Sequence, residues 1–357
     1  MIVEELHLER YRNAALADVA FDAGLTLVTG PNAQGKTNLL EAVYLLATGR
    51  SHRTSRAEEL VAFGEPFALL RARIRRPSGT FQLSARVEGG RVVRQRDGKL
   101  LRRGQDPLGD FGAVLFAPED LLALKGAPAE RRRLLDLDVG QASPVYRQAY
   151  LRYGQVLRQR NALLRRYEQP PRDLMSTWDV AWAQAALALT AERSRLAERL
   201  LPHFARRYGE IAGGGAAALH YEPSLQAQDA QGAVTALAQR RAEELRRRTS
   251  LLGPHRDDLR VESDGRDLRL YGSQGEQRTA LVAFKLAAVS LLGEGVGGPP
   301  VLLLDDVLSE LDQERRRNLL LAATGTQTIV TTTETALAGM QPGATYTVRG
   351  GEYRRTW

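Results

Sequence analysis

The residues with the clearest chemical purpose form one run, Gly30-Pro-Asn-Ala-Gln-Gly35-Lys36-Thr37, which fits the pattern G-x-x-x-x-G-K-[ST] in full. Glycines let such a loop curl so that its backbone N–H groups point at phosphate oxygens, and the helix that follows presents its N-terminus to the anion. Lys36 would neutralise the β- and γ-phosphates, and Thr37 would give an oxygen to Mg²⁺. The run therefore predicts an ATP and Mg²⁺ site made by Gly30, Pro31, Asn32, Ala33, Gln34, Gly35, Lys36, Thr37 and Asn38.

A second anchor for the metal is expected after the apolar run 301–304, which ends in the paired carboxylates Asp305 and Asp306. A buried strand end aims its last side chain at the phosphate loop, so Asp305 would be the Mg²⁺ partner. Asp306 would then polarise the attacking water as general base. The alternative interpretation is a solvated acidic turn after a core strand.

A third motif, Tyr271-Gly-Ser-Gln-Gly-Glu-Gln277, leads into a predicted helix over residues 278–292. A turn of small residues at a helix N-terminus binds anions, and a γ-phosphate is a natural ligand. One nucleotide needs only one phosphate loop, so Ser273, Gly275 and Glu276 make sense if they reach the nucleotide of another subunit. The alternative is an ordinary helix that begins with a serine cap.

The elements that must position these motifs divide the chain into three parts. Hydrophobic periodicity and turn residues predict a β-rich first third with one early helix, a helical middle from about 127 to 249, and an α/β last third. The predicted strands are 4–8, 24–28, an antiparallel meander at 67–74, 80–87 and 91–95, then 257–262, 267–271, 301–304 and 327–331. The predicted helices are 37–46, 145–168, 178–208, 232–249 and 278–292, two of them forming an antiparallel hairpin.

Composition narrows the class of protein. The 357 residues hold 50 Lys and Arg against 42 Asp and Glu, a formal net charge of +8, which is compatible with a nucleic-acid partner. The absence of cysteine excludes a disulfide framework, a cysteine-ligated metal site and a thiol nucleophile. No apolar run reaches the ~18 residues of a membrane helix, and the start shows no signal-peptide pattern, so we expect a cytoplasmic protein.

Taken together, the three motifs resemble those of the ABC/SMC-type ATPase superfamily, and more narrowly the RecF family of bacterial recombination mediators. The motifs run in family order over nearly the whole chain. Three more segments support the resemblance: residues 118–136, which depart from the family pattern at Leu134, where an aromatic is usual; Gly253-Pro-His-Arg-Asp-Asp258; and Leu308-Ser-Glu-Leu-Asp312.

The resemblance implies an α/β fold, an ABC-type ATPase head with mixed sheets and a helical second lobe that bears a short antiparallel hairpin. Lobe I would comprise residues 1–116 plus 296–357 and hold the phosphate loop and the paired aspartates. Lobe II would comprise 117–295 and carry the serine turn. ATP would lie between two heads, with Lys36, Thr37, Asp305 and Asp306 from one subunit and Ser273 and Gly275 from the other.

The sequence departs from the superfamily pattern in three places. No glutamine stands near residues 116–121, where a lobe-linking glutamine is usual, and Thr331 or Thr332 stands where transporters have a switch histidine. Asp306 replaces a more common glutamate, and because a shorter base reaches water less well, we expect slow turnover. Arg53 resembles an arginine near the phosphates, although a surface arginine is the other interpretation. By family position, Asn13 and Arg10 would approach the adenine.

The resemblance implies an ATP-driven homodimer that clamps double-stranded DNA near single-strand gaps and helps RecR and RecO load RecA, with weak DNA-stimulated ATP hydrolysis resetting it. Two basic segments would contact the DNA backbone: residues 70–103, with eleven Arg and Lys, and residues 131–166, with nine Arg. A solvated surface is the alternative for both. The alternative functions are a transporter motor subunit and a small-molecule kinase of the phosphate-loop class.

Overall fold

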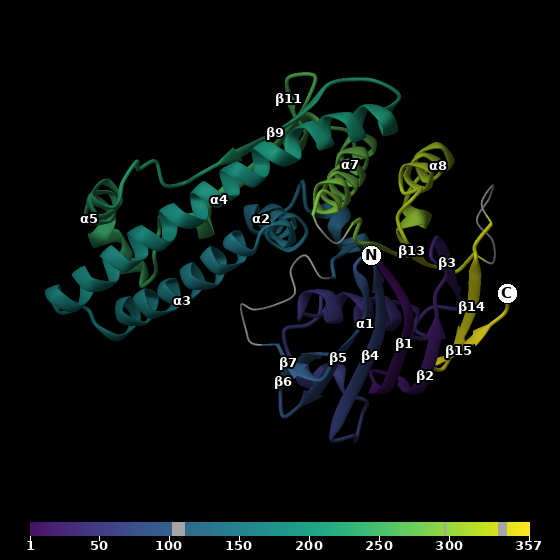
Figure 1. Ribbon diagram of the computed structural model, residues 1–357. Coiled ribbons are helices and arrows are strands. Elements are labelled where there is room, and N and C mark those ends of the chain that lie inside the picture. The colour runs from purple at the N-terminus through teal and green to yellow at the C-terminus, as the bar shows by residue number, and fades with distance from the viewer. Residues whose placement is uncertain (102–110, 296–297, 335–340) are drawn as a thin grey trace.

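The computed structural model describes residues 1–101, 111–295, 298–334 and 341–357. Figure 1 shows strands gathered around helix α1 (Lys36–Thr48) and a helical region from which α3 (Pro144–Arg166) and α4 (Arg172–Ala212) project side by side, away from the sheets. The two regions meet where α7 (Gln274–Gly293) packs near the strands. The helical hairpin expected in the middle of the chain is therefore confirmed.

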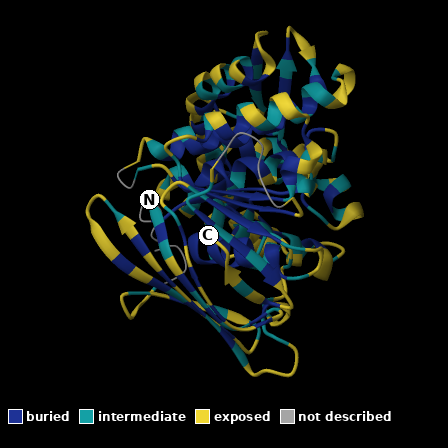
Figure 2. Cartoon of the chain, turned by 90° about the vertical axis from the view of Figure 1, so that its right-hand side faces the viewer, coloured by how far each residue is buried: buried dark blue, intermediate teal, exposed yellow. Residues whose placement is uncertain are grey.

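The first sheet is antiparallel and has the strand order β2-β1-β4-β5-β6-β7 within the described residues. Its strands alternate buried and exposed residues, as Figure 2 shows, because one face packs on the core and the other faces solvent. The predicted meander is confirmed, while β2 was not predicted. The bounds are β1 (Ile2–Tyr11), β2 (Ala14–Ala20), β4 (Phe67–Arg76), β5 (Gly79–Glu88), β6 (Arg91–Arg96) and β7 (Lys99–Leu100).

The central sheet carries the predicted catalytic elements and has the order β15-β14-β3-β13-β12-β8 in the described part of the chain. Strands β14, β3, β13, β12 and β8 pair in parallel, so their carboxyl ends lie at one edge, and β15 closes the sheet as a hairpin with β14. The bounds are β3 (Leu25–Thr29), β8 (Ala113–Phe116), β12 (Val301–Asp305), β13 (Thr328–Thr332), β14 (Ala344–Arg349) and β15 (Glu352–Arg355).

Helix α1 is almost entirely buried, because it lies between the two six-stranded sheets. Its apolar residues pack with Leu8, Leu70 and Leu303 in one hydrophobic cluster. A helix enclosed on both sides needs apolar residues around its whole circumference, which the run Leu39 to Leu46 supplies. Because α1 is packed between the two sheets, the position of the phosphate loop that precedes it is fixed.

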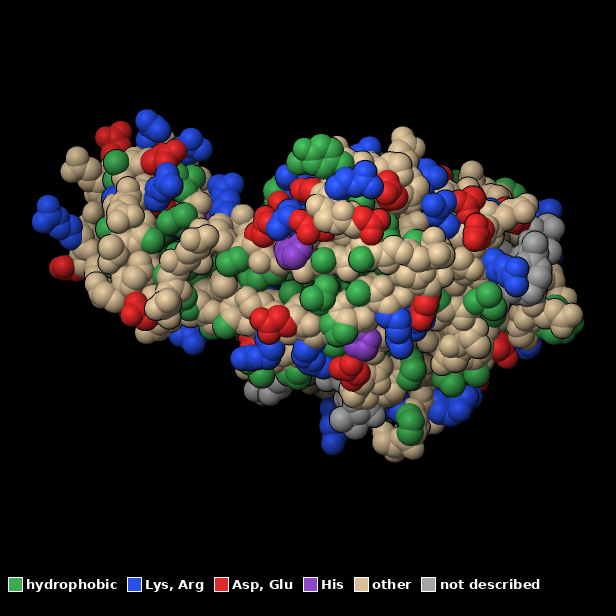
Figure 3. All heavy atoms as spheres, turned by 90° about the horizontal axis from the view of Figure 1, so that it is seen from above, with side chains coloured by type: hydrophobic (Ala, Val, Ile, Leu, Met, Phe, Trp, Pro, Cys, Tyr) green, Lys and Arg blue, Asp and Glu red, His purple; other side chains and the backbone are tan. Residues whose placement is uncertain are grey.

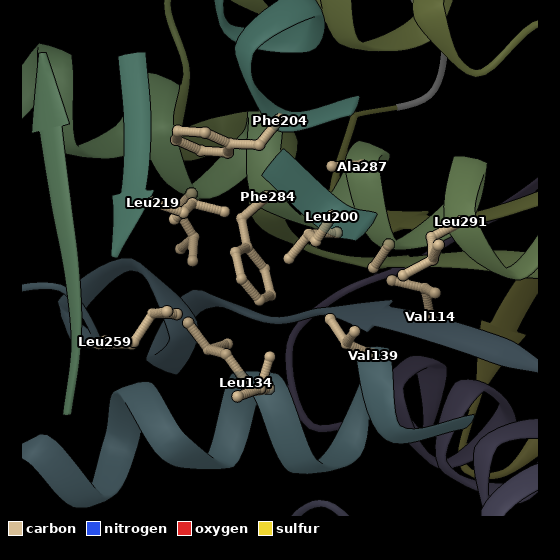
Figure 4. Packing of buried hydrophobic residues seen from close by; sticks show 14 of the residues in the cluster. Val114, Leu134, Val139, Leu200, Phe204, Leu219, Leu259, Phe284, Ala287 and Leu291 are labelled. Carbon is tan, nitrogen blue, oxygen red and sulfur yellow. The ribbon is translucent and has the colours of Figure 1, made fainter. Parts of the chain in front are cut away.

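A second hydrophobic cluster holds the helical region together. Figure 4 shows Phe284 of α7 at its centre, with Leu134, Leu200 and Leu259 around the ring. These residues come from four separate elements, so α7 joins the helical hairpin to the small sheet β11-β10-β9. The remaining bounds are α2 (Pro128–Leu137), α5 (Ala230–Arg247), α6 (Leu268–Tyr271), α8 (Gln313–Ala322), β9 (Ala217–Glu222), β10 (Asp258–Ser263) and β11 (Arg266–Asp267).

Two secondary-structure predictions are wrong. Residues 267–271, predicted as a strand, form only the end of β11 and then the short helix α6, because Asp267 caps a helical turn by accepting a hydrogen bond from the Arg269 N–H. The middle of the chain is not helical throughout, since β9 interrupts it and pairs antiparallel with β10. Strand β9 has a short alternating pattern that only a distant partner stabilises. The lobe boundaries predicted from the resemblance stay a prediction.

Candidate active site

The phosphate loop links β3 to α1 and has the backbone shape that its glycines predict. Gly30 and Gly35 have φ values of 150° and 112°, and Ala33 also lies at positive φ, 61°. A Cβ on Gly30 would lie 2.5 Å from the carbonyl oxygen of Val348, and one on Gly35 would lie 2.7 Å from Asn13 Oδ1. Both sites therefore favour glycine for conformation, and at Gly30 the backbone of Val348 also leaves no space for a Cβ.

The side chain of Lys36 is enclosed by the loop. Its Nζ donates hydrogen bonds to the carbonyl oxygens of Gly30 (2.8 Å) and Pro31 (3.2 Å), and its side chain is 4% exposed. Asp306 Oδ2 lies 3.7 Å from the same Nζ. The ammonium thus stands at the mouth of the loop, where phosphate oxygens would replace the two carbonyl contacts.

The carboxylate of Asp305 joins the acidic strand end to the phosphate loop. Thr37 Oγ1 donates a hydrogen bond to Asp305 Oδ1 (2.9 Å), and Thr331 Oγ1 donates to the same atom (2.7 Å). Burial raises the pKa of Asp305, although both threonine bonds act to lower it. A bound cation would lower that pKa again, and hydroxyl and carboxylate oxygens are ligands that Mg²⁺ prefers. Thr37 and Asp305 therefore fit a Mg²⁺ site.

Asp306 has an unusual backbone conformation. Its φ of 49° is left-handed, which is uncommon for a residue other than glycine. The conformation is held by its own N–H, which donates to the carbonyl oxygen (3.2 Å) and to Oγ1 (3.0 Å) of Thr331. The turn places the partly exposed carboxylate of Asp306 beside Lys36, where a solvated acidic turn would have pointed it outward.

The phosphate loop and Asp306 line a cavity of about 540 Å³. Seven of the predicted residues of the loop and of the acidic strand end line it: Asn32, Ala33, Gly35, Lys36, Thr37, Asn38 and Asp306. Asn13 and Arg53 line it too, and Arg53 Nη1 donates to Asn38 Oδ1 (2.8 Å). Arg12, Glu59, Val61 and Phe63 were not predicted, since no motif links the segment 59–63 to a nucleotide.

Arg10 does not line this cavity. Its guanidinium lies over the ring of Phe67, 4.8 Å from the centroid, and pairs with Glu65 (3.2 Å). The structure places Arg10 outside the cavity lining, and its approach to the adenine stays a prediction. Arg12, two positions further along the chain, lines the cavity instead.

Ser273 begins helix α7 and lies apart from the cavity within the described residues. Its Oγ accepts a hydrogen bond from the N–H of Glu276 (3.2 Å), while Glu276 Oε2 accepts one from the N–H of Ser273 (2.8 Å). This reciprocal cap is the ordinary way to begin a helix. Ser273 is nevertheless exposed, so its turn is open to a second molecule, and its role across a dimer stays a prediction.

Comparison with known proteins decides the family. A protein-family model described as an AAA domain matches residues 5–103 of this chain. The DNA replication and repair protein RecF of Shouchella clausii is 39% identical over 352 residues, covering 94% of each chain, and that of Gloeobacter violaceus is 42% identical over 353 residues, covering 96% of this chain and 94% of the relative. This chain belongs to the RecF family.

Solved structures agree with that assignment. The recombination mediator protein RecF with ATP, described as part of the RecFOR pathway, superposes on this chain with a TM-score of 0.90 at 29% identity, covering 99% of this chain and 97% of that one. An SMC head bound to the C-winged helix domain of ScpA shares the fold, with a TM-score of 0.58 at 18% identity over 100% and 98% of the two chains. The predicted fold, an ABC-type ATPase head with a helical region, is confirmed.

Not all arginines of the two predicted basic segments are placed where they could contact DNA. Arg131 pairs with both carboxylate oxygens of Asp258 (2.7 and 2.8 Å) and is 3% exposed, while the fully buried Arg160 pairs with Asp179 and Glu244. These two side chains stabilise the helical region and are not available to DNA. Arg94, similarly, donates to the carbonyl oxygen of Leu46 (3.0 Å) at the end of α1.

The face of the molecule drawn in Figure 3 does not show one continuous basic area among the described residues. On the face in Figure 3, basic and acidic side chains are interspersed. Exposed arginines nevertheless follow one side of β4, at Arg71, Arg73 and Arg75, and the last two pair with Glu4. Residues 102 and 103 of the first basic segment lie outside the described residues. In the part of the chain that the structure describes, no helix combines the length and apolar character needed to cross a membrane.

Proposed function

We propose that this chain is an ATP-dependent mediator of recombinational DNA repair, and that its nucleotide site is the cavity between the phosphate loop and Asp306. The observation that carries the proposal is the hydrogen bond from Thr37 to Asp305, which joins two motifs 268 positions apart. Relatives named as DNA replication and repair proteins, 39% and 42% identical over nearly the whole chain, support the repair role. They also disfavour the transporter motor and the small-molecule kinase.

In this proposal each residue has a separate task in ATP hydrolysis. The loop N–H groups and Lys36 bind the phosphates, and Thr37 and Asp305 hold Mg²⁺, which would neutralise charge on the phosphate oxygens. Asp306 orients the attacking water and accepts its proton, since its carboxylate is partly exposed beside Lys36. Because aspartate is a short base, turnover is slow, and we propose that bound DNA stimulates it.

We further propose that ATP joins two copies of the chain. Each copy offers an exposed Ser273 turn that does not line its own cavity, so Ser273 and Gly275 are free to meet the nucleotide of the other copy. The lobe of residues 117–295 would carry this turn toward the lobe of 1–116 plus 296–357. The closed dimer clamps double-stranded DNA near single-strand gaps, and RecR and RecO then help to load RecA.

Sedimentation with ATP, Mg²⁺ and duplex DNA tests this function. We expect an ATP-dependent dimer that binds the duplex less tightly as salt is raised, because backbone contacts release counterions. Lys36→Met removes ATP binding, whereas Ser273→Arg leaves ATP binding intact and prevents the dimer. A chain that remains monomeric at saturating ATP would overturn the clamp, and an ATP dimer with no affinity for DNA would overturn the repair role.

A further inference from the structure

Arg315, in the first turn of α8, connects this helix to α7, the helix that begins at Ser273. Figure 1 shows α8 beside α7, and the two helices are in contact. Arg315 Nε donates a hydrogen bond to Thr279 Oγ1 (2.8 Å), and Arg315 Nη1 pairs with the carboxylate of Asp312. Because Thr279 is 1% exposed, this hydrogen bond takes the place of one to solvent.

The same guanidinium also packs against Gly275 in the serine turn. A Cβ on Gly275 would lie 3.2 Å from Arg315 Nη2 and 3.6 Å from Arg315 Cζ, so only a residue without a side chain lets the guanidinium approach this closely. Thr279 follows Gly275 by four residues and therefore shares its side of α7. Arg315 thus holds the first two turns of α7, at the end that carries Ser273.

The segment of residues 308–312 links these contacts to the candidate active site. It follows Asp306, whose carbonyl oxygen accepts a hydrogen bond from Ser309 Oγ (2.7 Å). A second arginine, Arg278 of α7, reaches the same segment, since its Nη1 donates to the carbonyl oxygen of Glu310 (2.6 Å). Two arginines therefore fix the start of α7 relative to the acidic strand end of the same chain.

We propose that Arg315 is a positioning residue, which holds the Ser273 turn in the orientation that meets the nucleotide of a second copy. This inference rests on the proposed ATP-driven dimer. Asp312 neutralises the charge of Arg315, so the contribution is orientation and not charge. The fixed fork of a guanidinium contacts Asp312, Thr279 and Gly275 at once, which the single ammonium of a lysine cannot do. A turn held in advance loses less conformational freedom when two copies associate.

The test compares dimerisation with ATP binding by the single chain. Arg315→Met and Arg315→Lys should both weaken the ATP-dependent dimer about tenfold, the loss expected when one hydrogen bond to a charged group is removed. Sedimentation over a range of protein concentrations measures this change. The Kd for ATP, measured at protein concentrations too low for dimerisation, should stay unchanged, because Arg315 does not line the cavity. Arg317→Met, at an exposed arginine of the same helix, is the matched control and should dimerise normally.

A second pair of variants tests the contact from the side of α7. Thr279→Val removes the hydroxyl and keeps the shape of the side chain, so it should weaken the dimer as Arg315→Met does. Thr279→Ser keeps the hydroxyl and should dimerise like the unchanged chain. Arg315→Met combined with Thr279→Val should cost no more than either change alone, because both remove the same hydrogen bond.

The outcomes separate the positioning role from the proposed function. Normal dimerisation of Arg315→Met or of Arg315→Lys would overturn the role, the latter because charge alone would then suffice. Equal losses of dimerisation and of single-chain ATP affinity would also overturn it, since the cavity itself would then be disturbed. Equal dimerisation of Thr279→Val and Thr279→Ser would show that the hydroxyl contact has no part in it. If the unchanged chain did not dimerise with ATP, the proposed function itself would fail.

Discussion

The phenol of Tyr353 donates a hydrogen bond to the carbonyl oxygen of Gly35 (2.7 Å), so the last strand of the chain holds the phosphate loop near its beginning. The turn before Tyr353 adds two more bonds to the loop, since the N–H of Gly350 donates to Gln34 Oε1 (2.8 Å) and that of Gly351 donates to the Gln34 carbonyl oxygen (3.0 Å). The β14–β15 hairpin therefore positions the loop without lining the cavity.

Removing the Tyr353 hydroxyl tests this support. We expect Tyr353→Phe to raise the Kd for ATP about fivefold. The lost hydrogen bond contributes about 1 kcal/mol to the free energy that holds the loop in its binding conformation. Isothermal titration measures the Kd, and circular dichroism checks the fold. Tyr167→Phe, at a tyrosine that ends α3 and lies outside the cavity lining, is the control. Equal ATP affinity in Tyr353→Phe and the unchanged chain would contradict the positioning role.

Replacing Asp305 separates metal binding from folding. Asp305→Asn should reduce Mg²⁺-dependent ATP hydrolysis by about a hundredfold, because the metal would lose its charged ligand. The unfolding temperature should not fall, since an amide oxygen still accepts from Thr37 and Thr331 and no buried charge remains. Hydrolysis is measured across a Mg²⁺ titration. Full hydrolysis by the variant at the same Mg²⁺ concentration would refute the assignment.

Replacing Asp306 should lower the rate of ATP hydrolysis and leave the affinity for ATP unchanged. Asp306→Asn keeps the size of the side chain and should lower ATP hydrolysis by about a hundredfold, the typical contribution of a general base. ATP affinity should remain close to that of the unchanged chain, and the ATP dimer should persist for longer. Glu314→Gln, at an exposed residue in the first turn of α8, is the control. Unimpaired hydrolysis in Asp306→Asn would remove the proposed base.

The buried ion pair of Arg160 with Glu244 predicts a large effect on stability. Glu244 accepts from Arg160 Nη2 (2.6 Å), and both side chains are 0% exposed. Glu244→Gln leaves the guanidinium without its full counter-charge and should lower the free energy of unfolding by about 3 kcal/mol. Its neighbour Glu243, which pairs with Arg247 at the surface, is the matched control, and Glu243→Gln should cost less than about 1 kcal/mol. Denaturant unfolding of both variants compares the two costs directly.

His255 makes stability depend on pH. Its Nε2–H donates to the carbonyl oxygen of Ser250 (3.0 Å), and its Nδ1 accepts from the hydroxyl of Tyr153 (2.6 Å), so the ring is neutral. Burial lowers the pKa of His255 to about 4. Because the unfolded chain, with a histidine pKa near ~6.5, binds more protons between pH 6.5 and 4, stability falls as the pH falls through that window.

The contribution of His255 to this loss is roughly 3 kcal/mol from its pKa shift. His255→Gln should therefore flatten the pH dependence of the unfolding free energy between pH 6.5 and 4. His220→Gln, at a ring that is 42% exposed, is the control for a histidine-to-glutamine change at the surface. An identical slope in His255→Gln and the unchanged chain would contradict a neutral, buried role for this histidine.

The sequence predicts the parts of the site that depend on neighbours in the chain. A phosphate loop is made by consecutive residues whose backbone N–H groups face one anion, so its spacing is visible without a fold. The paired aspartates are visible for a similar reason, since they end the apolar strand 301–304. Long helices such as α3 and α4 are also predictable, because their apolar spacing repeats over many turns.

The sequence alone could not predict which arginines stay available to a partner. Arg131 and Arg160 belong to a basic segment, and their burial depends on Asp258 and Glu244, 127 and 84 positions away. Strand β9 and helix α6 were misassigned for the same reason, because short elements take their conformation from the partner they pair with or the cap they receive.

Sequence by itself therefore determined the family, the phosphate loop and the acidic strand end, since each is encoded in local spacing. Only the tertiary structure decided that Tyr353 supports Gly35, that Asp306 turns toward Lys36, and that Phe63 faces the same cavity. The physical reason is that the cavity walls form where segments distant in the chain come together at one edge of a sheet. The spacing of side chains within one segment does not predict which distant segment will lie beside it.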